Sequence, residues 1–201
     1  MHLFTWVPLN ESWGVPFISV DRRQQEFSQT LYHLLKSFDS TRLVVGNDGW
    51  EMTETDLCAI HNYDHGEKND EKAHAKFRES LSCREELLYT YTAGRKIFVD
   101  GWKDRGQPVL LTEFGGISFA EQDDKAWGYT CIRDGAELEK EYERILDAIC
   151  ASDSIAGFCY TQLADVEQET NGLLTCDRVP KIRTEIIRKI NDRVNKKRIR
   201  I

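Results

Sequence analysis

The sequence predicts a parallel α/β fold, and three observations point to it. Short apolar runs of strand length occur along the chain. They alternate with longer segments whose apolar residues recur at helical spacing, which is typical of a parallel sheet joined by helical crossovers. Polar and charged residues follow each apolar run, as they do at the carboxyl ends of parallel strands, where such enzymes gather their chemistry.

Five apolar runs have the length and composition of strands. They lie at about residues 3–9, 42–46, 57–60, 108–112 and 155–161. No glycine-rich nucleotide-binding motif occurs in the chain, which argues against a doubly wound nucleotide-binding protein. Five strands are also too few to close an eight-stranded barrel.

Helical signals are strongest in three segments. Asp21 is suited to cap a helix that runs through Phe38. The apolar residues expected on its inward face are Phe27, Leu31, Leu34, Leu35 and Phe38. Residues 136–151 predict a second amphipathic helix, and Pro180 stands where a proline can open a final one. The residues expected to face inward on the second helix are Leu138, Tyr142, Ile145, Leu146 and Ile149.

Two weaker segments lie between the third and fourth expected strands. Residues 84–92 suit a short helix. The highly charged stretch 67–76 has no apolar face and is expected to be a surface loop.

The composition excludes several classes of partner. With 27 Lys and Arg against 34 Asp and Glu, the net charge is −7, whereas nucleic acid favours a basic face. The basic residues at 196–200 suit a solvated helix end. No apolar run approaches the roughly 20 residues of a membrane span. We therefore expect neither a nucleic acid nor a membrane partner.

The cysteine pattern and the first residues indicate a cytoplasmic protein. The six cysteines are scattered without a CxxC pair, so a zinc or redox motif is not expected. Cys58, Cys150 and Cys159 lie in apolar segments and are expected to be buried, reduced thiols. The stretch from Met1 to Trp6 lacks the basic region of a signal peptide.

Two glutamates are the candidate catalytic residues. The apolar run 108–112 delivers Glu113 to its carboxyl end, and Glu11 follows the first expected strand. In a parallel sheet both side chains emerge at the same edge. Paired carboxylates flanking one bond are what glycoside hydrolysis requires, one protonated to donate to the leaving oxygen and one ionised. The alternative is a pair of ordinary glutamates at strand ends.

The residues around these glutamates resemble glycoside hydrolase family 2. The motifs that carry the resemblance, in chain order, are Asn10-Glu11, Val45-Gly46-Asn47-Asp48-Gly49-Trp50-Glu51, Ile60-His61-Asn62-Tyr63-Asp64, Thr112-Glu113-Phe114-Gly115-Gly116, and residues 157–173 with Asp177-Arg178 and Pro180-Lys181. The resemblance implies that residues 1–201 are the C-terminal part of a catalytic (β/α)8 TIM barrel, about strands four to eight with their helices. The N-terminal β-sandwich domains and the first three βα units of that family would be absent.

The resemblance also implies roles. Glu11 would be the acid/base, Glu113 the nucleophile, and Asn10 a hydrogen-bond partner of the sugar 2-hydroxyl. Tyr63 matches a tyrosine that hydrogen-bonds the nucleophile in many members of the clan, and Asn62 precedes it. No metal and no cofactor is expected.

Other candidate substrate-binding residues have an equally simple structural explanation. Trp50 and Trp13 could stack on sugar rings or pack at the rim. His61 could hydrogen-bond in the pocket or be a structural histidine, and a metal site with His65 is not expected. Tyr160 stands where many clan members place a tryptophan platform, which leaves the identity of the sugar open.

The leading hypothesis is a retaining β-glycosidase catalytic region acting on terminal β-galactosides or β-glucuronides. Retention would place the two carboxyl groups about 5–5.5 Å apart. The alternative is a catalytically silent fragment that binds carbohydrate or complements another chain, and a doubly wound binding protein is a third possibility. Because an opened barrel exposes strand edges, we expect self-association or a partner that covers them.

Overall fold

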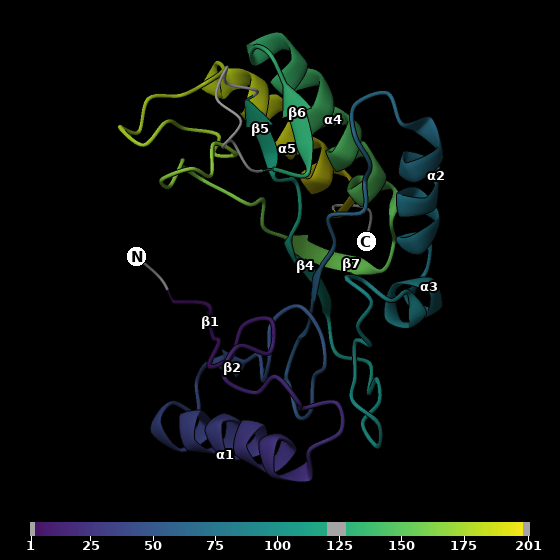
Figure 1. The fold of residues 1–201 in the computed structure, drawn as a ribbon, viewed down its shortest axis with the longest axis vertical. Coiled ribbons are helices and arrows are strands. Elements are labelled where there is room, and N and C mark those ends of the chain that lie inside the picture. The colour runs from purple at the N-terminus through teal and green to yellow at the C-terminus, as the bar shows by residue number, and fades with distance from the viewer. Residues whose placement is uncertain (1–2, 120–127, 199–201) are drawn as a thin grey trace. The chain divides into compact units, whose positions relative to one another are not determined.

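The computed structural model describes residues 3–119 and 128–198, with a mixed α/β fold of seven strands and five helices in that part of the chain (Figure 1). The chain forms two compact units. Unit 1 comprises Met1–Asn62, Arg84–Glu113 and Ile155–Phe158, and unit 2 comprises Tyr63–Cys83, Phe114–Ser154 and Cys159–Ile201. None of the described helices is both long enough and apolar enough to span a lipid bilayer.

Unit 1 contains five strands, all paired in parallel. They are β1 (Thr5–Trp6), β2 (Leu43–Val44), β3 (Cys58–His61), β4 (Val109–Glu113) and β7 (Ile155–Phe158). β1 pairs with β2, and β4 lies between β3 and β7. Isolated parallel bridges join Asn10 to Asp48 and Gly49 to Ile60, so the pairing follows chain order beyond the strands themselves. The carboxyl ends of these segments therefore lie at one edge.

Apolar residues bury the strands of unit 1 and leave polar groups at their ends. All four residues of β3 are buried, as are Val109 and Leu111 of β4. Val45, Leu57 and Ala59 form one core cluster, against which Leu110 packs. Because both faces of β3 are covered, it reads as a continuous apolar run, which is why its position could be predicted.

Helix α1 (Arg22–Phe38) begins at the predicted N-cap, where the Asp21 side chain accepts a hydrogen bond from the Arg23 amide. The prediction of its inward face was wrong for three residues, since Phe27, Leu34 and Phe38 are exposed. The buried residues are Gln25, Ser28 and Tyr32.

Hydrogen bonds to neighbouring segments of the same chain explain why the polar face of α1 is buried. Tyr32 donates to Asp56 at 2.6 Å, Ser28 lies 2.9 Å from the Thr53 hydroxyl, and Gln25 donates to the Ile18 carbonyl at 2.9 Å. These groups keep partners when buried, so the polar face can be enclosed without a large desolvation cost.

Unit 2 combines three helices with a small parallel sheet. Its elements are α2 (Glu71–Ser80), β5 (Ile117–Phe119), β6 (Thr130–Ile132), α4 (Gly135–Ala151) and α5 (Thr184–Arg198). β5 pairs with β6, and α4 contacts α2, α5 and β5 (Figure 1). The predicted inward face of α4 is confirmed: Leu138, Tyr142, Ile145, Leu146 and Ile149 are all buried.

Each predicted strand position contains a strand, but two further strands were not predicted and the start of the last helix was wrong. Within the described residues the strands form three small sheets and no closed barrel. β5 and β6 were not predicted, since each has only three residues. The final helix begins at Thr184 rather than at Pro180, which bridges Leu174. The short helix predicted at 84–92 is present as α3 (Arg84–Tyr89).

The charged segment 67–76 was predicted to be a loop, but its residues from Glu71 onward belong to helix α2. Asp70 caps this helix by accepting from the Ala73 amide. Its buried residues His74, Phe77 and Ser80 extend beyond the charged stretch, so no apolar face is visible within that stretch.

All six cysteines are free, including Cys58, Cys150 and Cys159, for which reduced thiols were predicted, but the burial of these three is mixed. Cys58 is buried, and burial raises the pKa of its thiol to about 12. Cys150 is only half-buried and Cys159 is exposed, so the expectation of burial was wrong for those two. Cys159 directly follows the short β7, outside the apolar part of the segment.

Gly115 in unit 2 occupies a position that only glycine fits. Its φ is +99°, a conformation in which side chains are strained. A Cβ there would lie 2.3 Å from Cε2 of Tyr160. The tight turn after Glu113 and the placement of the Tyr160 ring therefore both depend on this glycine.

Replacing Gly115 with alanine should lower the free energy of unfolding by roughly 2–5 kcal/mol, from backbone strain and overpacking together. Gly106→Ala is the matched control, because its φ is +86° but nothing lies within 4 Å of its added Cβ. That control should cost about 1 kcal/mol. Urea unfolding of both variants measures the difference, and equal losses would contradict the role of the Tyr160 contact.

Candidate active site

The two candidate catalytic glutamates come together in unit 1. Glu11 lies just after β1, and Glu113 is the last residue of β4. A carboxylate oxygen of Glu11 lies within 4.8 Å of one from Glu113. Their side chains are 28% and 30% exposed, so a ligand can reach both while each is partly shielded from water.

His61 links the two carboxylates. Its side chain is fully buried at the end of β3, and Nδ1 lies 2.8 Å from Glu11 Oε1 and 3.5 Å from Glu113 Oε2. Its Nε2 lies 3.2 Å from Asp48 Oδ1, but the two atoms are not aligned for a hydrogen bond, so that contact is an ion pair. One imidazole thus faces three carboxylates.

Asp48 is a member of this cluster that sequence reasoning missed. Its Oδ1 accepts a 2.5 Å hydrogen bond from the Thr112 hydroxyl, and its carbonyl accepts from the Glu11 amide at 2.9 Å. The available signal was its position, since it follows β2 as Glu11 follows β1. Asp48 therefore ties together the ends of β2, β4 and the Glu11 segment.

The surroundings of His61 favour its charged form. Burial lowers the pKa of the imidazole, but the carboxylates of Asp48, Glu113 and Glu11 outweigh this and raise its pKa above the ordinary value. The imidazolium offsets part of the repulsion among the three carboxylates, which is expensive in a buried site.

Four further nominated residues lie in unit 1. Asn10 is exposed and pairs with Asp48 through a backbone bridge. Asn62 is buried, and its amide donates to the Glu113 carbonyl at 3.0 Å. Trp50 is 8% exposed and its ring meets His61 edge to face at 5.8 Å, so it packs behind the imidazole. Trp13 is 76% exposed.

Tyr63 and Tyr160 belong to unit 2. Tyr63 stacks on Tyr129, with ring centroids 4.0 Å apart and an interplanar angle of 12°. The Tyr160 hydroxyl donates to the Asn171 carbonyl at 3.1 Å, and its ring meets Phe114 edge to face. Burial raises the pKa of the Tyr160 phenol above its ordinary range.

The cluster of Glu11, His61 and Glu113 also offers three donor atoms within 4.8 Å of one another. In the described structure these donors satisfy one another as a hydrogen-bonded and ion-paired group. His65 is engaged elsewhere in unit 2, where its ring nitrogens lie 2.7 and 3.0 Å from the carbonyls of Gly115 and Gly66.

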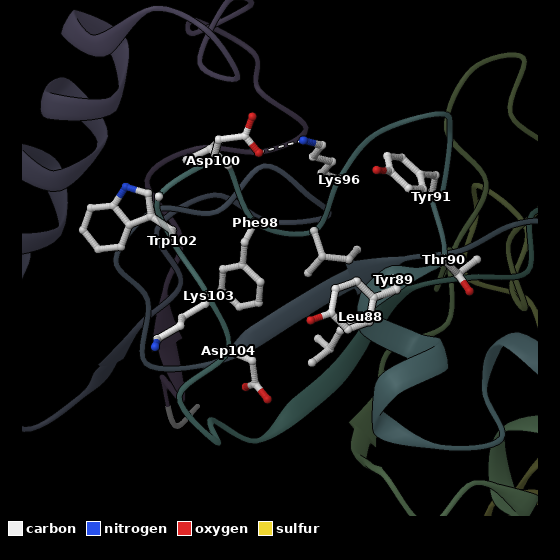
Figure 2. A pocket seen from close by; sticks show the side chains of 13 residues that line it. Leu88, Tyr89, Thr90, Tyr91, Lys96, Phe98, Asp100, Trp102, Lys103 and Asp104 are labelled. Carbon is white, nitrogen blue, oxygen red and sulfur yellow. Dashed lines mark hydrogen bonds and ion pairs between the residues drawn. The ribbon is translucent and has the colours of Figure 1, made fainter.

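A separate cavity of about 290 Å³ lies along residues 88–104 of unit 1 (Figure 2). Tyr89, Tyr91, Phe98 and Trp102 supply its aromatic lining, and Lys96 pairs with Asp100 at its margin (Figure 2). None of the candidate catalytic residues lines this cavity.

The raised pKa of His61 predicts a pH dependence of stability. A group whose pKa rises on folding adds stability that is complete below its unfolded pKa, about 6.5, and is lost as pH rises through the folded value. The difference in unfolding free energy between the parent protein and His61→Gln should therefore shrink above that pH. Urea unfolding across neutral to mildly alkaline pH measures it. A difference that is constant or grows with pH would contradict the assignment.

No protein-family model matches the chain, and no curated protein matches it either. Solved structures do resemble it. A β-glucuronidase from Faecalibacterium prausnitzii is 18% identical with a TM-score of 0.60, over 96% of this chain and 31% of its own. A GH2 β-galacturonidase from Eisenbergiella tayi is 16% identical with a TM-score of 0.58, over 96% of this chain and 33% of its own. The agarase AgWH50C is 14% identical with a TM-score of 0.55, over 87% and 25%.

The chain thus spans between about a quarter and a third of the length of these structures. At such identities the likeness concerns the fold. The protein has a mixed α/β fold with parallel strands, and this fold is similar to part of these solved structures.

Proposed function

We propose that this chain carries the catalytic pair of a retaining β-glycosidase, with Glu11 as acid/base and Glu113 as nucleophile. The observation that carries the proposal is the meeting of two strand-end carboxylates within 4.8 Å, with a buried imidazole beside both. The glycoside hydrolase-like fold supports it independently.

In the first step Glu113 attacks the anomeric carbon of a β-glycoside. The bond from that carbon to the glycosidic oxygen breaks, and Glu11 donates its proton to the departing oxygen. This leaves a covalent glycosyl-enzyme on Glu113 and an ionised Glu11. In the second step Glu11 takes a proton from water, the water oxygen attacks the anomeric carbon, and the Glu113 carboxylate is released.

The spacing of the two carboxylates allows the retaining mechanism that we propose. Inverting enzymes separate their carboxyl groups by about 6.5–9.5 Å to leave room for water, whereas retaining enzymes need about 5–5.5 Å. The closest approach of 4.8 Å or less between oxygens of Glu11 and Glu113 agrees with the shorter separation.

His61 fits a supporting role in proton handling. The Nδ1 atom of the imidazolium lies 2.8 Å from Glu11 Oε1, so its proton can pass to the carboxylate that must act as an acid. After Glu11 takes a proton from water in the second step, it can return a proton to the ring, which restores the starting state. The contact with Glu113 keeps positive charge close to the nucleophile, which favours its ionised form.

The substrates that we propose are terminal β-glucuronides or β-galactosides. Similar structures include β-glucuronidases and a β-galacturonidase, which act on uronic acid glycosides according to their names. Asn10 would hydrogen-bond the sugar 2-hydroxyl. The other residues of unit 1 that we assign to substrate binding are Trp50, His61 and Asn62.

We further propose that the chain corresponds to strands four to eight of a TIM barrel. Five parallel segments paired in chain order support this, as does the partial coverage of the longer neighbours. Large apolar side chains near β1 are exposed, including Phe4, Val7 and Leu43. A second copy or a chain segment that completes the barrel would cover this edge.

A catalytically silent fragment is the second candidate. The observation that favours it is the short span of the chain relative to its neighbours, since positioning a sugar would also need groups from outside this span. Correctly placed carboxylates without such groups lose much of their power. In that case the chain would bind carbohydrate or complement another chain.

A 2-fluoro glycoside carrying a good leaving group tests the mechanism, because the fluorine slows hydrolysis of the covalent intermediate. We expect one glycosyl group to be added to Glu113, detected by intact mass and peptide mapping. The chain should be used alone and together with a segment that completes the barrel. No adduct on Glu113 with the barrel completed would contradict the mechanism.

Turnover of nitrophenyl glycosides separates the active chain from the silent one. Glu113→Gln should reduce kcat/KM by roughly 10⁴-fold or more, since a nucleophile cannot be replaced by an amide. Glu26→Gln is a matched control, because Glu26 is an exposed glutamate on α1 paired with Arg22. Parent activity no higher than that of Glu113→Gln would favour the silent fragment.

A further inference from the structure

The backbone at the proposed acid/base is strained. Glu11 and Ser12 are consecutive non-glycine residues with φ of +52° and +61°. Side chains disfavour this left-handed region, and such residues persist only where their surroundings hold them. The contacts of these two residues should therefore reveal what holds Glu11 in place.

Ser12 is the anchor of this strained segment. It is 3% exposed, and its amide donates to Asn47 Oδ1 at 3.1 Å. Its hydroxyl donates to Glu51 Oε2 at 2.6 Å and accepts from Asn47 Nδ2 at 3.0 Å. Asn47 is itself fixed, because its Nδ2 also donates to the Trp50 carbonyl at 2.8 Å. Every polar group of the Ser12 side chain is thus engaged.

Glu51 is a buried carboxylate whose negative charge is paired with the more exposed guanidinium of Arg95. It is 5% exposed, and Oε2 also accepts from Arg95 Nη1 at 2.9 Å. Its own φ is +48°, and its amide donates to the Lys96 carbonyl at 2.8 Å. Removing one partner of such a pair would leave a buried charge uncompensated. Neither Glu51 nor Arg95 is needed for the chemistry proposed above.

Arg95 comes from a stretch of chain remote in sequence from both Glu11 and Glu51. This stretch continues through Lys96 and Phe98 into the wall of the cavity in Figure 2. The Arg95 guanidinium also lies over the Trp50 ring, 5.9 Å from its centroid. The connection therefore runs from the side chain of Arg95 through Glu51 and Ser12 to the backbone of Glu11.

We propose that Ser12, braced by Asn47, Glu51 and Arg95, is a positioning device that holds the Glu11 carboxylate against His61. The role of Glu11 as acid/base rests on the function proposed above, but the contact between Glu11 and His61 does not. Without the Ser12 hydroxyl, the backbone of Glu11 and Ser12 relaxes and the Glu11 carboxylate leaves His61 Nδ1.

The pKa of His61 reports the position of Glu11 without any turnover. The charged groups that face the imidazole are Glu11, Glu113 and Asp48, so withdrawing Glu11 removes one of three stabilising carboxylates. NMR titration of the five histidines, assigned with His61→Gln, measures this value. Glu11→Gln sets the full effect, which we expect to be on the order of a tenfold loss of proton affinity.

Ser12→Ala should lower the proton affinity of His61 by most of the Glu11→Gln effect. Arg95→Met should lower it in the same direction, although removal of a cation would by simple electrostatics raise it. This opposite sign separates positioning from direct charge effects. Ser37→Ala is the matched control, since Ser37 is an exposed serine on α1 that bonds only the Leu34 carbonyl, and it should change nothing.

An unchanged proton affinity of His61 in Ser12→Ala would overturn the proposal. A raised proton affinity of His61 in Arg95→Met would overturn it too. So would Glu11→Gln without effect, because the contact itself would then be absent. Arg95 is 40% exposed, so its variant should fold even if Ser12→Ala does not, as a thermal melt can verify.

Activity supplies a second readout where turnover is measurable. A misplaced acid should slow substrates with poor leaving groups, such as alkyl glycosides, by roughly 10–100-fold while dinitrophenyl glycosides change little. Equal losses on both would overturn the positioning role. If no variant or parent shows turnover, the proposed function fails, whereas the titration still decides whether Ser12 positions Glu11.

Discussion

The buried imidazole of His61 is the group on which the arrangement of the candidate site depends. Three carboxylates, from Glu11, Asp48 and Glu113, approach one ring that is closed to solvent. Carboxylates so close together repel one another unless a cation or a shared proton compensates. The imidazolium supplies that compensation, and its two nitrogens fix the directions from which the carboxylates approach.

Parallel pairing is what allows one histidine to do this. β1, β3 and β4 lead into Glu11, His61 and Glu113, and the bridge between Asn10 and Asp48 adds a fourth segment. Short strands suffice, because apolar residues such as Leu111 anchor each segment just before its polar end. Backbone strain lies at Glu11 and Ser12, where the chain must turn after β1, and a buried hydrogen-bond network offsets it there.

Much of the fold could be predicted because its signals are local. The cap at Asp21, the apolar face of α4 and the continuous apolar run of β3 each lie within one short window of sequence. α2 was missed because its buried residues extend beyond the charged stretch that begins it. The buried face of α1 was wrong because side-chain hydrogen bonds to distant residues, such as that from Tyr32 to Asp56, outweigh apolar periodicity.

Some residues of the candidate site could be predicted from the sequence and others could not. Glu11, His61 and Glu113 could be predicted because each lies at the end of an apolar, strand-like run. Asp48 had the same signal but was passed over. The pairing of Ser12 with Glu51 and Arg95 has no local signature, since it joins three distant parts of the chain through side-chain geometry. The sequence also gave no indication that Tyr63 and Tyr160 belong to a different compact unit from the glutamates.

The central claim is that Glu11 and Glu113 act together in a double displacement. The most direct measurement is the anomeric configuration of the sugar at the moment of release, followed by proton NMR during hydrolysis of a β-glycoside. The chain should be assayed alone and together with a segment that completes the proposed barrel. The account predicts that the β-anomer appears first and then equilibrates. Initial release of the α-anomer would contradict it, because a single inverting displacement would then be at work.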